Sequence, residues 1–164
     1  MPTIKDNFLS KGEFDRVCSF FSDPNTAWQI KHGIASEKTN NLDDYFFCHM
    51  VYGNLTPQSP FFPELITMLS LRFTKHLIAR IKCNLYTRTN EVVKHTWHID
   101  DPNLTTLKGA LLMLNTCDGY TGFEDGTKVE SVANRMVFFD ALKPHHSTST
   151  SNASTRLTLN INYI

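Results

Sequence analysis

Residues 156–163 read RLTLNINY, a run in which polar and apolar side chains alternate. Successive side chains of a β-strand point to opposite faces, so this run predicts a strand with one polar and one apolar face. The apolar set is Leu157, Leu159 and Ile161, and the polar set is Arg156, Thr158 and Asn160. We expect the apolar face to pack against helices and the polar face to point into the protein.

An arginine on the inner face of a strand needs a partner, because burying a charge without one is costly. A carboxylate would satisfy Arg156, since the guanidinium fork matches it with two parallel hydrogen bonds. The hydroxyl of Thr158 could donate to the same group. The alternative is an edge strand from which Arg156 points outward into solvent.

The same period of two begins at residue 80. In residues 80–86, one face carries Arg80, Lys82, Asn84 and Tyr86, and the other carries Ile81, Cys83 and Leu85. Asn84 and Tyr86 could hydrogen-bond an enclosed polar ligand, or Tyr86 could be an ordinary buried tyrosine. Turn residues separate four further expected strands. These strands cover residues 95–100, 108–114, 128–132 and 135–139.

The first half of the chain has a different pattern. Apolar residues at helical spacing predict a helix around residues 14–21, and residues 45–52 predict a strand. Ser59 and Pro60 suggest the cap and first turn of a second helix that continues to Phe73. We therefore expect one α+β domain over residues 1–164. Residues 1–78 would be mainly helical support, and residues 80–164 would form a β-sandwich of jelly-roll type.

Composition excludes some classes of function. Lys and Arg together number 16, as do Asp and Glu, so the formal net charge is +0. This balance argues against a protein that binds nucleic acid or anionic membranes through charge alone. The chain shows neither an apolar run of about 20 residues nor a secretory signal, so we expect a cytoplasmic protein without a membrane span. Its four cysteines are widely spaced and are expected to be reduced and mostly buried.

A possible metal site comes from His98-Ile99-Asp100. On a strand, His98 and Asp100 would project from the same face, and imidazole with carboxylate suits Fe(II), Mn(II) or Zn(II). A surface histidine beside a turn aspartate is the alternative. The pair His145-His146 could supply a third ligand. Adjacent residues of an extended segment point in opposite directions, so only one of the two would bind the metal.

These motifs together resemble the double-stranded β-helix core of the 2-oxoglutarate- and iron(II)-dependent oxygenases. The resemblance is greatest to small prolyl-hydroxylase-like members, many of them encoded by phages and bacteria. It covers about half the chain. The matching segments are NLYTRT (84–89), WHID (97–100), GYT to EDG (119–126), NRMVFFD (134–140), PHHS (144–147), RLT (156–158) and NINY (160–163).

The resemblance implies that His98, Asp100 and His145 hold Fe(II). His145 is preferred to His146 because the family places the ligand before a small residue, here Ser147. A second histidine directly after the ligand departs from the family pattern, so the choice between His145 and His146 stays open.

The resemblance also assigns the cosubstrate. Arg156 and Thr158 would hold the distal carboxylate of 2-oxoglutarate, and Tyr86 with Asn84 would contact the same molecule. Many relatives have serine at the position of Thr158, but the hydroxyl is kept. Arg88 and Trp97 flank the expected mouth and could touch substrate, or could be a solvated arginine and a packing tryptophan.

The implied activity converts 2-oxoglutarate and O2 to succinate and CO2 while hydroxylating a C–H bond, with ascorbate as a possible reductant. The expected substrate is a prolyl residue of a peptide or protein, acted on in the cytoplasm, or in the host cytoplasm if the chain is phage-encoded. Halogenation is disfavoured, since related halogenating enzymes lack the carboxylate at Asp100. The alternatives are a small-molecule or nucleobase substrate, with nucleic acid disfavoured by the charge balance, and a non-catalytic metal-binding jelly-roll module.

Overall fold

The computed structural model describes residues 1–33 and 45–164, which contain two α-helices and eleven β-strands. In chain order the elements are β1 (Thr3–Lys5), α1 (Lys11–Ser22), β2 (Gln29–His32), β3 (Tyr45–Gly53), β4 (Thr56–Pro57), α2 (Phe62–Ser70), β5 (Ile78–Thr87), β6 (Lys108–Met113), β7 (Tyr120–Phe123), β8 (Lys128–Glu130), β9 (Met136–Asp140), β10 (His145–His146) and β11 (Thr155–Tyr163).

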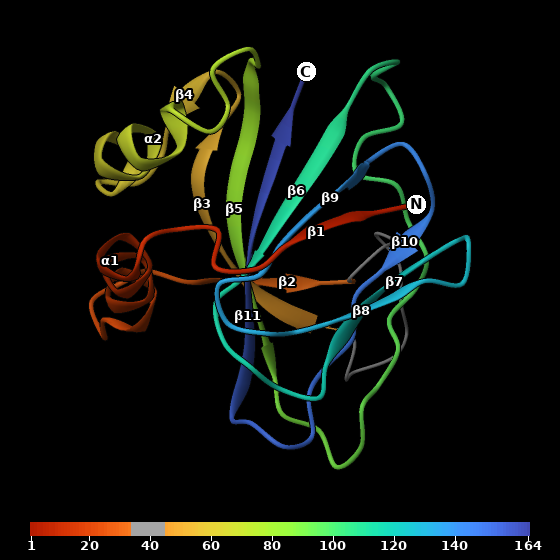
Figure 1. The fold of residues 1–164 in the computed structure, drawn as a ribbon. Helices are drawn as coiled ribbons and strands as arrows, with labels where there is room; N and C mark the ends of the chain where they lie inside the picture. Colours follow the sequence, from red (N-terminus) through yellow and green to blue (C-terminus); the bar gives the residue numbers. More distant parts are fainter. Residues whose placement is uncertain (34–44) are drawn as a thin grey trace.

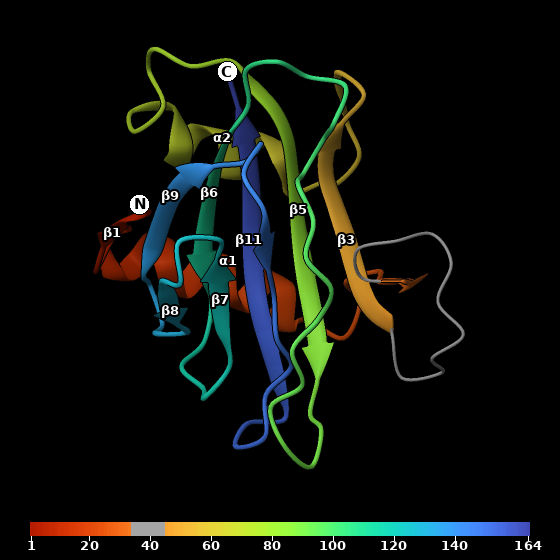
Figure 2. The same ribbon diagram turned by 90° about the vertical axis from the view of Figure 1, so that its right-hand side faces the viewer.

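The strands form two antiparallel sheets. The major sheet has eight strands in the order β1-β9-β6-β11-β5-β3-β2, with β4 paired to β3, and the minor sheet has the order β10-β7-β8. The two helices lie on one side of the major sheet and the minor sheet lies on the other (Figures 1 and 2). The result is an α+β sandwich, as the sequence predicts.

The centre of the major sheet is the stretch quoted first, now β11, which pairs with β5 and β6. Its alternation works as expected. Leu159 and Ile161 are fully buried in the core cluster under the helices, together with Ile81 and Cys83 of β5. Arg156 lies on the opposite face, between the sheets, and is 0% exposed.

The two helices cover the apolar face with short buried stripes. Val17 and Phe21 of α1 and Leu65 and Leu69 of α2 are buried there. Helix α1 begins with a capping box, in which the Ser10 side chain accepts from the Glu13 amide while Glu13 accepts from the Ser10 amide.

The expected start of the second helix is wrong. Its N-cap is Phe61, without a capping side-chain hydrogen bond, and the proline of its first turn is Pro63. Ser59 is used differently, because its Oγ accepts a hydrogen bond from the Phe61 amide and contacts His49 Nε2 at 2.8 Å. Phe73 lies beyond the helix and is nevertheless buried.

Two strand expectations also need correction. Residues 95–100 do not form a strand, because the segment has a single isolated bridge, between His98 and His145. Strand β7, by contrast, lies where only a motif and turns were expected. The first 78 residues contribute strands β1 to β4 as well as both helices, so helical support describes them only in part.

Two smaller expectations concern the cysteines and the membrane. All four cysteines are free; Cys48, Cys83 and Cys117 are buried and Cys18 is partly buried, as predicted. Within residues 1–33 and 45–164, neither helix has the length and apolar character needed to cross a membrane.

Candidate metal centre

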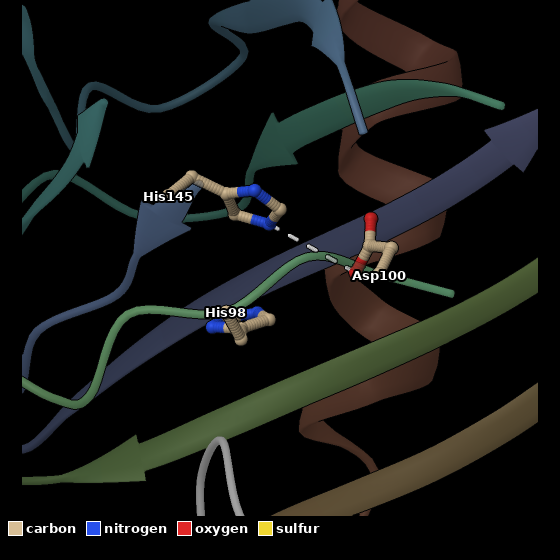
Figure 3. A group of neighbouring side chains, drawn as sticks. All are labelled: His98, Asp100 and His145. Atoms are coloured by element: carbon tan, nitrogen blue, oxygen red, sulfur yellow. Dashed lines mark ion pairs between the residues drawn. The ribbon is translucent and has the colours of Figure 1, made fainter. Parts of the chain in front are cut away.

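Three side chains converge between the two sheets. One ligand atom from each of His98, Asp100 and His145 can be chosen so that all three lie within 4.8 Å of one another. His98 and Asp100 come from the segment between β5 and β6, and His145 comes from β10 (Figure 3). This is the set that the sequence pattern brings together, although the backbone of residues 95–100 is not a regular strand.

Backbone hydrogen bonds fix the positions of these residues. The amide of His98 donates to the carbonyl of His145, and the amide of His145 donates to the carbonyl of His98, both at 2.9 Å. The amide of Asp100 donates to the carbonyl of Ala141 at 3.0 Å. The segment that carries two of the candidate ligands is therefore fastened to the strand that carries the third.

The histidine rings are oriented with one nitrogen available. Nδ1 of His145 lies 3.0 Å from the carbonyl of Lys143, and Nδ1 of His98 lies 3.4 Å from the carbonyl of Thr96. A carbonyl only accepts, so each Nδ1 donates the hydrogen bond and each Nε2 is the ring nitrogen left to bind a metal. Burial, helped by His145, lowers the pKa of His98 to about 4, which leaves this ring neutral at pH 7.

Asp100 is held by two other side chains. Its Oδ2 accepts from the Asn162 amide at 2.8 Å, and its Oδ1 lies 3.3 Å from Arg80 Nη2 and 3.9 Å from His145 Nε2. Burial alone would raise the pKa of Asp100, but His145, Arg80 and Asn162 together hold it below its usual value. The carboxylate is therefore ionised and ready to bind a cation.

The second histidine of the pair points elsewhere. The ring of His146 packs edge-on against Trp97, with centroids 4.5 Å apart, and against Tyr120. It occupies space that only a glycine leaves free, since a Cβ on Gly122 would lie 2.1 Å from His146 Nε2. The geometry thus groups His145, and not His146, with His98 and Asp100.

A small cavity of about 40 Å³ adjoins these ligands. Its lining includes both candidate histidine ligands and every residue that the sequence assigned to the cosubstrate. The lining residues are Phe46, Lys82, Asn84, Tyr86, His98, Leu111, Thr121, Phe139, His145, Ser147, Arg156, Thr158 and Asn160. The position expected for a small polar ligand is therefore a real hollow beside the metal ligands.

Arg156 lies in this cavity without an acidic partner among the described residues. Its guanidinium donates to the carbonyl of Thr148 at 3.1 Å and to Thr121 Oγ1 at 2.9 Å, and it lies 5.7 Å from the centre of the Tyr86 ring. Burial lowers the pKa of Arg156. A buried cation held only by neutral groups fits an anionic ligand in the cavity.

Three polar atoms of the cavity wall lack hydrogen-bond partners among the described residues. They are Arg156 Nε, Asn84 Oδ1 and Asn160 Oδ1. Buried polar groups are normally paired, so these atoms indicate a polar ligand. A donor set of two imidazoles and a carboxylate suits Fe(II). The guanidinium of Arg156, whose Nε has no partner among the described residues, suits a carboxylate. The residues therefore fit the pair of iron and 2-oxoglutarate.

Two predicted site residues lie apart from the cavity lining. Arg88 is exposed, and Trp97 is 42% exposed with the ammonium of Lys94 4.5 Å from the centre of its ring.

Sequence reasoning missed two residues that complete the site. Lys82 lines the cavity, and Asn162 positions Asp100. The alternation of side chains along a strand could have located both. Lys82 lies two residues from Asn84 on β5, and Asn162 lies four residues from Thr158 on β11, so each shares a face with a predicted site residue.

No protein-family model matches the sequence. No curated protein matches it either.

Solved structures do match the fold. A 2OG-Fe(II) oxygenase-family oxidoreductase from Burkholderia pseudomallei aligns with 99% of this chain and 84% of its own at a TM-score of 0.74 and 12% identity. A non-heme α-ketoglutarate-dependent carbocyclase from nogalamycin biosynthesis aligns over 99% and 78% at a TM-score of 0.69 and 13% identity. A prolyl-4-hydroxylase from Pseudomonas putida aligns over 99% and 91% at a TM-score of 0.64 and 16% identity.

At these identities the likeness establishes the fold. The chain has the double-stranded β-helix fold of the 2-oxoglutarate oxygenases, which confirms the predicted fold class.

Proposed function

We propose that this chain is an Fe(II)- and 2-oxoglutarate-dependent dioxygenase that hydroxylates a C–H bond. One observation carries the proposal: His98 and His145 of the metal cluster line the same cavity as Arg156, a fully buried cation without an acidic partner among the described residues. Neither the metal cluster nor the buried arginine is specific by itself. Binding of 2-oxoglutarate requires both, a metal site and, beside it, a cation that binds the distal carboxylate. The fold of the matching structures supports the same conclusion.

The role of the protein's own residues is to hold the metal and the cosubstrate and to orient them. When bound, iron with 2-oxoglutarate and O2 supplies the oxidising chemistry, which yields succinate and CO2. Nε2 of His98, Nε2 of His145 and the carboxylate of Asp100 would bind the metal from one side, leaving its other positions for ligands. The Nδ1–H hydrogen bonds to backbone carbonyls keep both rings in the orientation that this binding needs.

The cosubstrate would lie along the strand pair β5–β11. Arg156 would hold its distal carboxylate, with the Thr158 hydroxyl two residues along the same face. Tyr86 and Asn84 are the registered partners of Arg156 and Thr158 on β5, so all four side chains face the same part of the cavity.

For the substrate we propose a prolyl residue of a peptide or protein. The Pseudomonas putida prolyl-4-hydroxylase supports this choice, and the carbocyclase supports a small molecule as the second candidate. Arg88 and Trp97 would then contact the parts of the substrate outside the cavity. A nucleobase in nucleic acid is disfavoured by the formal net charge of +0. A metal-binding module without turnover is the non-enzymatic alternative.

The test is binding of 2-oxoglutarate by calorimetry, in Mn(II) and without O2, followed by succinate formation with Fe(II), ascorbate and O2. We expect 2-oxoglutarate to bind and slow succinate formation to follow. His145→Ala should lose metal binding, whereas His146→Ala should retain it because His146 packs away from the site. Absence of 2-oxoglutarate binding to the metal-loaded wild type would refute the proposal. Tight binding of Zn(II) without turnover would favour the module.

A further inference from the structure

Lys82 is one of the residues that line the cavity. Among the described residues it forms no ion pair within 4.0 Å and no side-chain hydrogen bond. Its neighbour Arg80 is different, because Arg80 is engaged by Asp100 and by Asn162 Oδ1. Asp100 is thus already paired, and it attracts Lys82 only at longer range, without a direct contact.

Lys82 stands at the mouth of the cavity. Of the thirteen lining residues, all are buried except Lys82 and His98, which are partly exposed. His98 is a candidate metal ligand. Together with His98, Lys82 is therefore the part of the described lining that is most accessible to a molecule in solution.

The place of Lys82 is also separate from the arginine end of the cavity. In the register of β5 with β11, Tyr86 lies opposite Arg156 and Lys82 lies opposite Asn160. Four residues along a strand correspond to a rise of about 13 Å between Cα positions, so Lys82 and Arg156 project from different points along the strand pair.

The charge balance of the loaded site leaves an anion to be supplied. Fe(II) and the 2-oxoglutarate dianion cancel each other, and Arg80 cancels Asp100. Arg156 and Lys82 remain, so the site keeps two positive charges, and no acidic residue is among the described residues that line the cavity. Arg80 and Lys31 of β2 repel Lys82, and the attraction by Asp100 offsets part of this repulsion.

We infer that the substrate of this enzyme carries a carboxylate close to the carbon that is oxidised, and that Lys82 binds this carboxylate at the cavity mouth. The inference rests on the proposed function and narrows its substrate to carboxylic acids. Applied to the prolyl substrate, it specifies a proline whose own carboxylate is free, instead of one inside a peptide. Lys82 is then a specificity-determining residue.

The experiment compares acids with their amides on protein loaded with Mn(II) and 2-oxoglutarate without O2, so that binding is read without turnover. The probes are N-acetyl-L-proline, benzoate and cyclohexanecarboxylate, each paired with its carboxamide, and calorimetry or Mn(II) relaxation reports binding. In the wild type we expect the acids to bind about tenfold or more tightly than the amides, the effect of one charge-assisted hydrogen bond.

Three variants complete the design. Lys82→Met should remove the preference for acids, Lys82→Arg should retain it, and Lys11→Met on the exposed face of α1 is the matched control. If no acid exceeds its amide, or if Lys82→Met keeps the preference, the inference is overturned while the proposed function stands. If Lys82→Met loses 2-oxoglutarate itself, Lys82 belongs to the cosubstrate and the inference is likewise overturned. Failure of the wild type to bind 2-oxoglutarate refutes the proposed function instead.

Discussion

Asn162 donates a hydrogen bond to Asp100 Oδ2 at 2.8 Å, across 62 residues of sequence. The same amide group accepts two hydrogen bonds from Arg80 through its oxygen. Asn162 is 1% exposed, so water does not compete for these contacts. The orientation of the candidate metal-binding carboxylate is therefore set by a residue on the last strand of the chain.

Replacing this amide should weaken metal binding. We expect Asn162→Leu, which keeps the size of the side chain, to lower Mn(II) affinity about 10- to 100-fold, because partners that orient a metal ligand contribute to that extent. Calorimetry or competition with a chelator would measure it. Asn25→Leu, in the exposed turn after α1, is the control. An unchanged dissociation constant in Asn162→Leu would show that Arg80 alone positions Asp100.

Arg156→Met should separate ligand binding from stability. Removing the guanidinium should reduce 2-oxoglutarate affinity by about 100-fold or more, since a buried charge-assisted pair is lost. The free protein should be as stable as the wild type or more so, because a well-packed apolar side chain often replaces a buried charge without loss. The unfolding temperature without 2-oxoglutarate measures the stability, and its rise on adding 2-oxoglutarate measures the affinity. Arg16→Met, which breaks an exposed pair with Glu64, should leave the affinity unchanged. Marked destabilisation of unliganded Arg156→Met would contradict this account.

Gly119 makes room for the arginine. A Cβ at this position would lie 2.6 Å from Arg156 Cδ and 2.5 Å from the carbonyl oxygen of Ser149. We expect Gly119→Ala to displace the guanidinium and to weaken 2-oxoglutarate binding, with a stability loss of about 1–3 kcal/mol from overpacking. The control is Gly12→Ala on α1, where an added Cβ meets nothing within 4 Å. Equal 2-oxoglutarate affinities in the two variants would refute the role given to Gly119.

The ion pair between Glu13 of α1 and Arg72, which follows α2, should make stability depend on pH. The hydrogen bonds that Arg72 and Ser10 donate lower the pKa of Glu13 to about 2, from 4.5. The folded state thus binds the proton more weakly than the unfolded state, so this contribution is complete above about pH 4.5 and is lost as pH falls towards 2. Because Glu13 is partly exposed, we expect only about 1–2 kcal/mol.

Denaturant unfolding between pH 5 and 2 measures this contribution. Glu13→Gln should flatten that part of the stability profile, whereas Glu64→Gln, in the exposed pair with Arg16, should change stability by at most about 1 kcal/mol. A wild-type profile with the same slope as that of Glu13→Gln would show that Glu13 is not responsible.

The inner strands could be predicted because each has one apolar and one polar face. The alternation in residues 80–86 and 156–163 led to β5, β11 and the direction of Arg156, and the structure confirms all three. The short strands could not be found in this way. Strand β10 has two residues and β1 three, which is too short for a period to emerge.

The metal cluster was predicted for a reason that holds only in part. The spacing placed His98 and Asp100 on one face of a strand, but residues 95–100 contain only a single isolated bridge, between His98 and His145. The side chains converge because reciprocal backbone hydrogen bonds tie His98 to His145. These hydrogen bonds join residues that are 47 positions apart in the sequence, and the polar and apolar pattern of a short segment does not reveal such contacts. The family resemblance supplied what the spacing could not.

The reciprocal backbone hydrogen bonds between His98 and His145 hold these two residues together whatever side chains flank them. The rest of residues 88–107 reaches the sheets through further backbone hydrogen bonds and through a few side chains, among them Thr89, Trp97 and Leu107. Substitutions or insertions elsewhere in residues 88–107 would change which molecules reach the metal site without moving His98 relative to His145. Exchange of this connection between relatives is therefore a practical route to engineering selectivity.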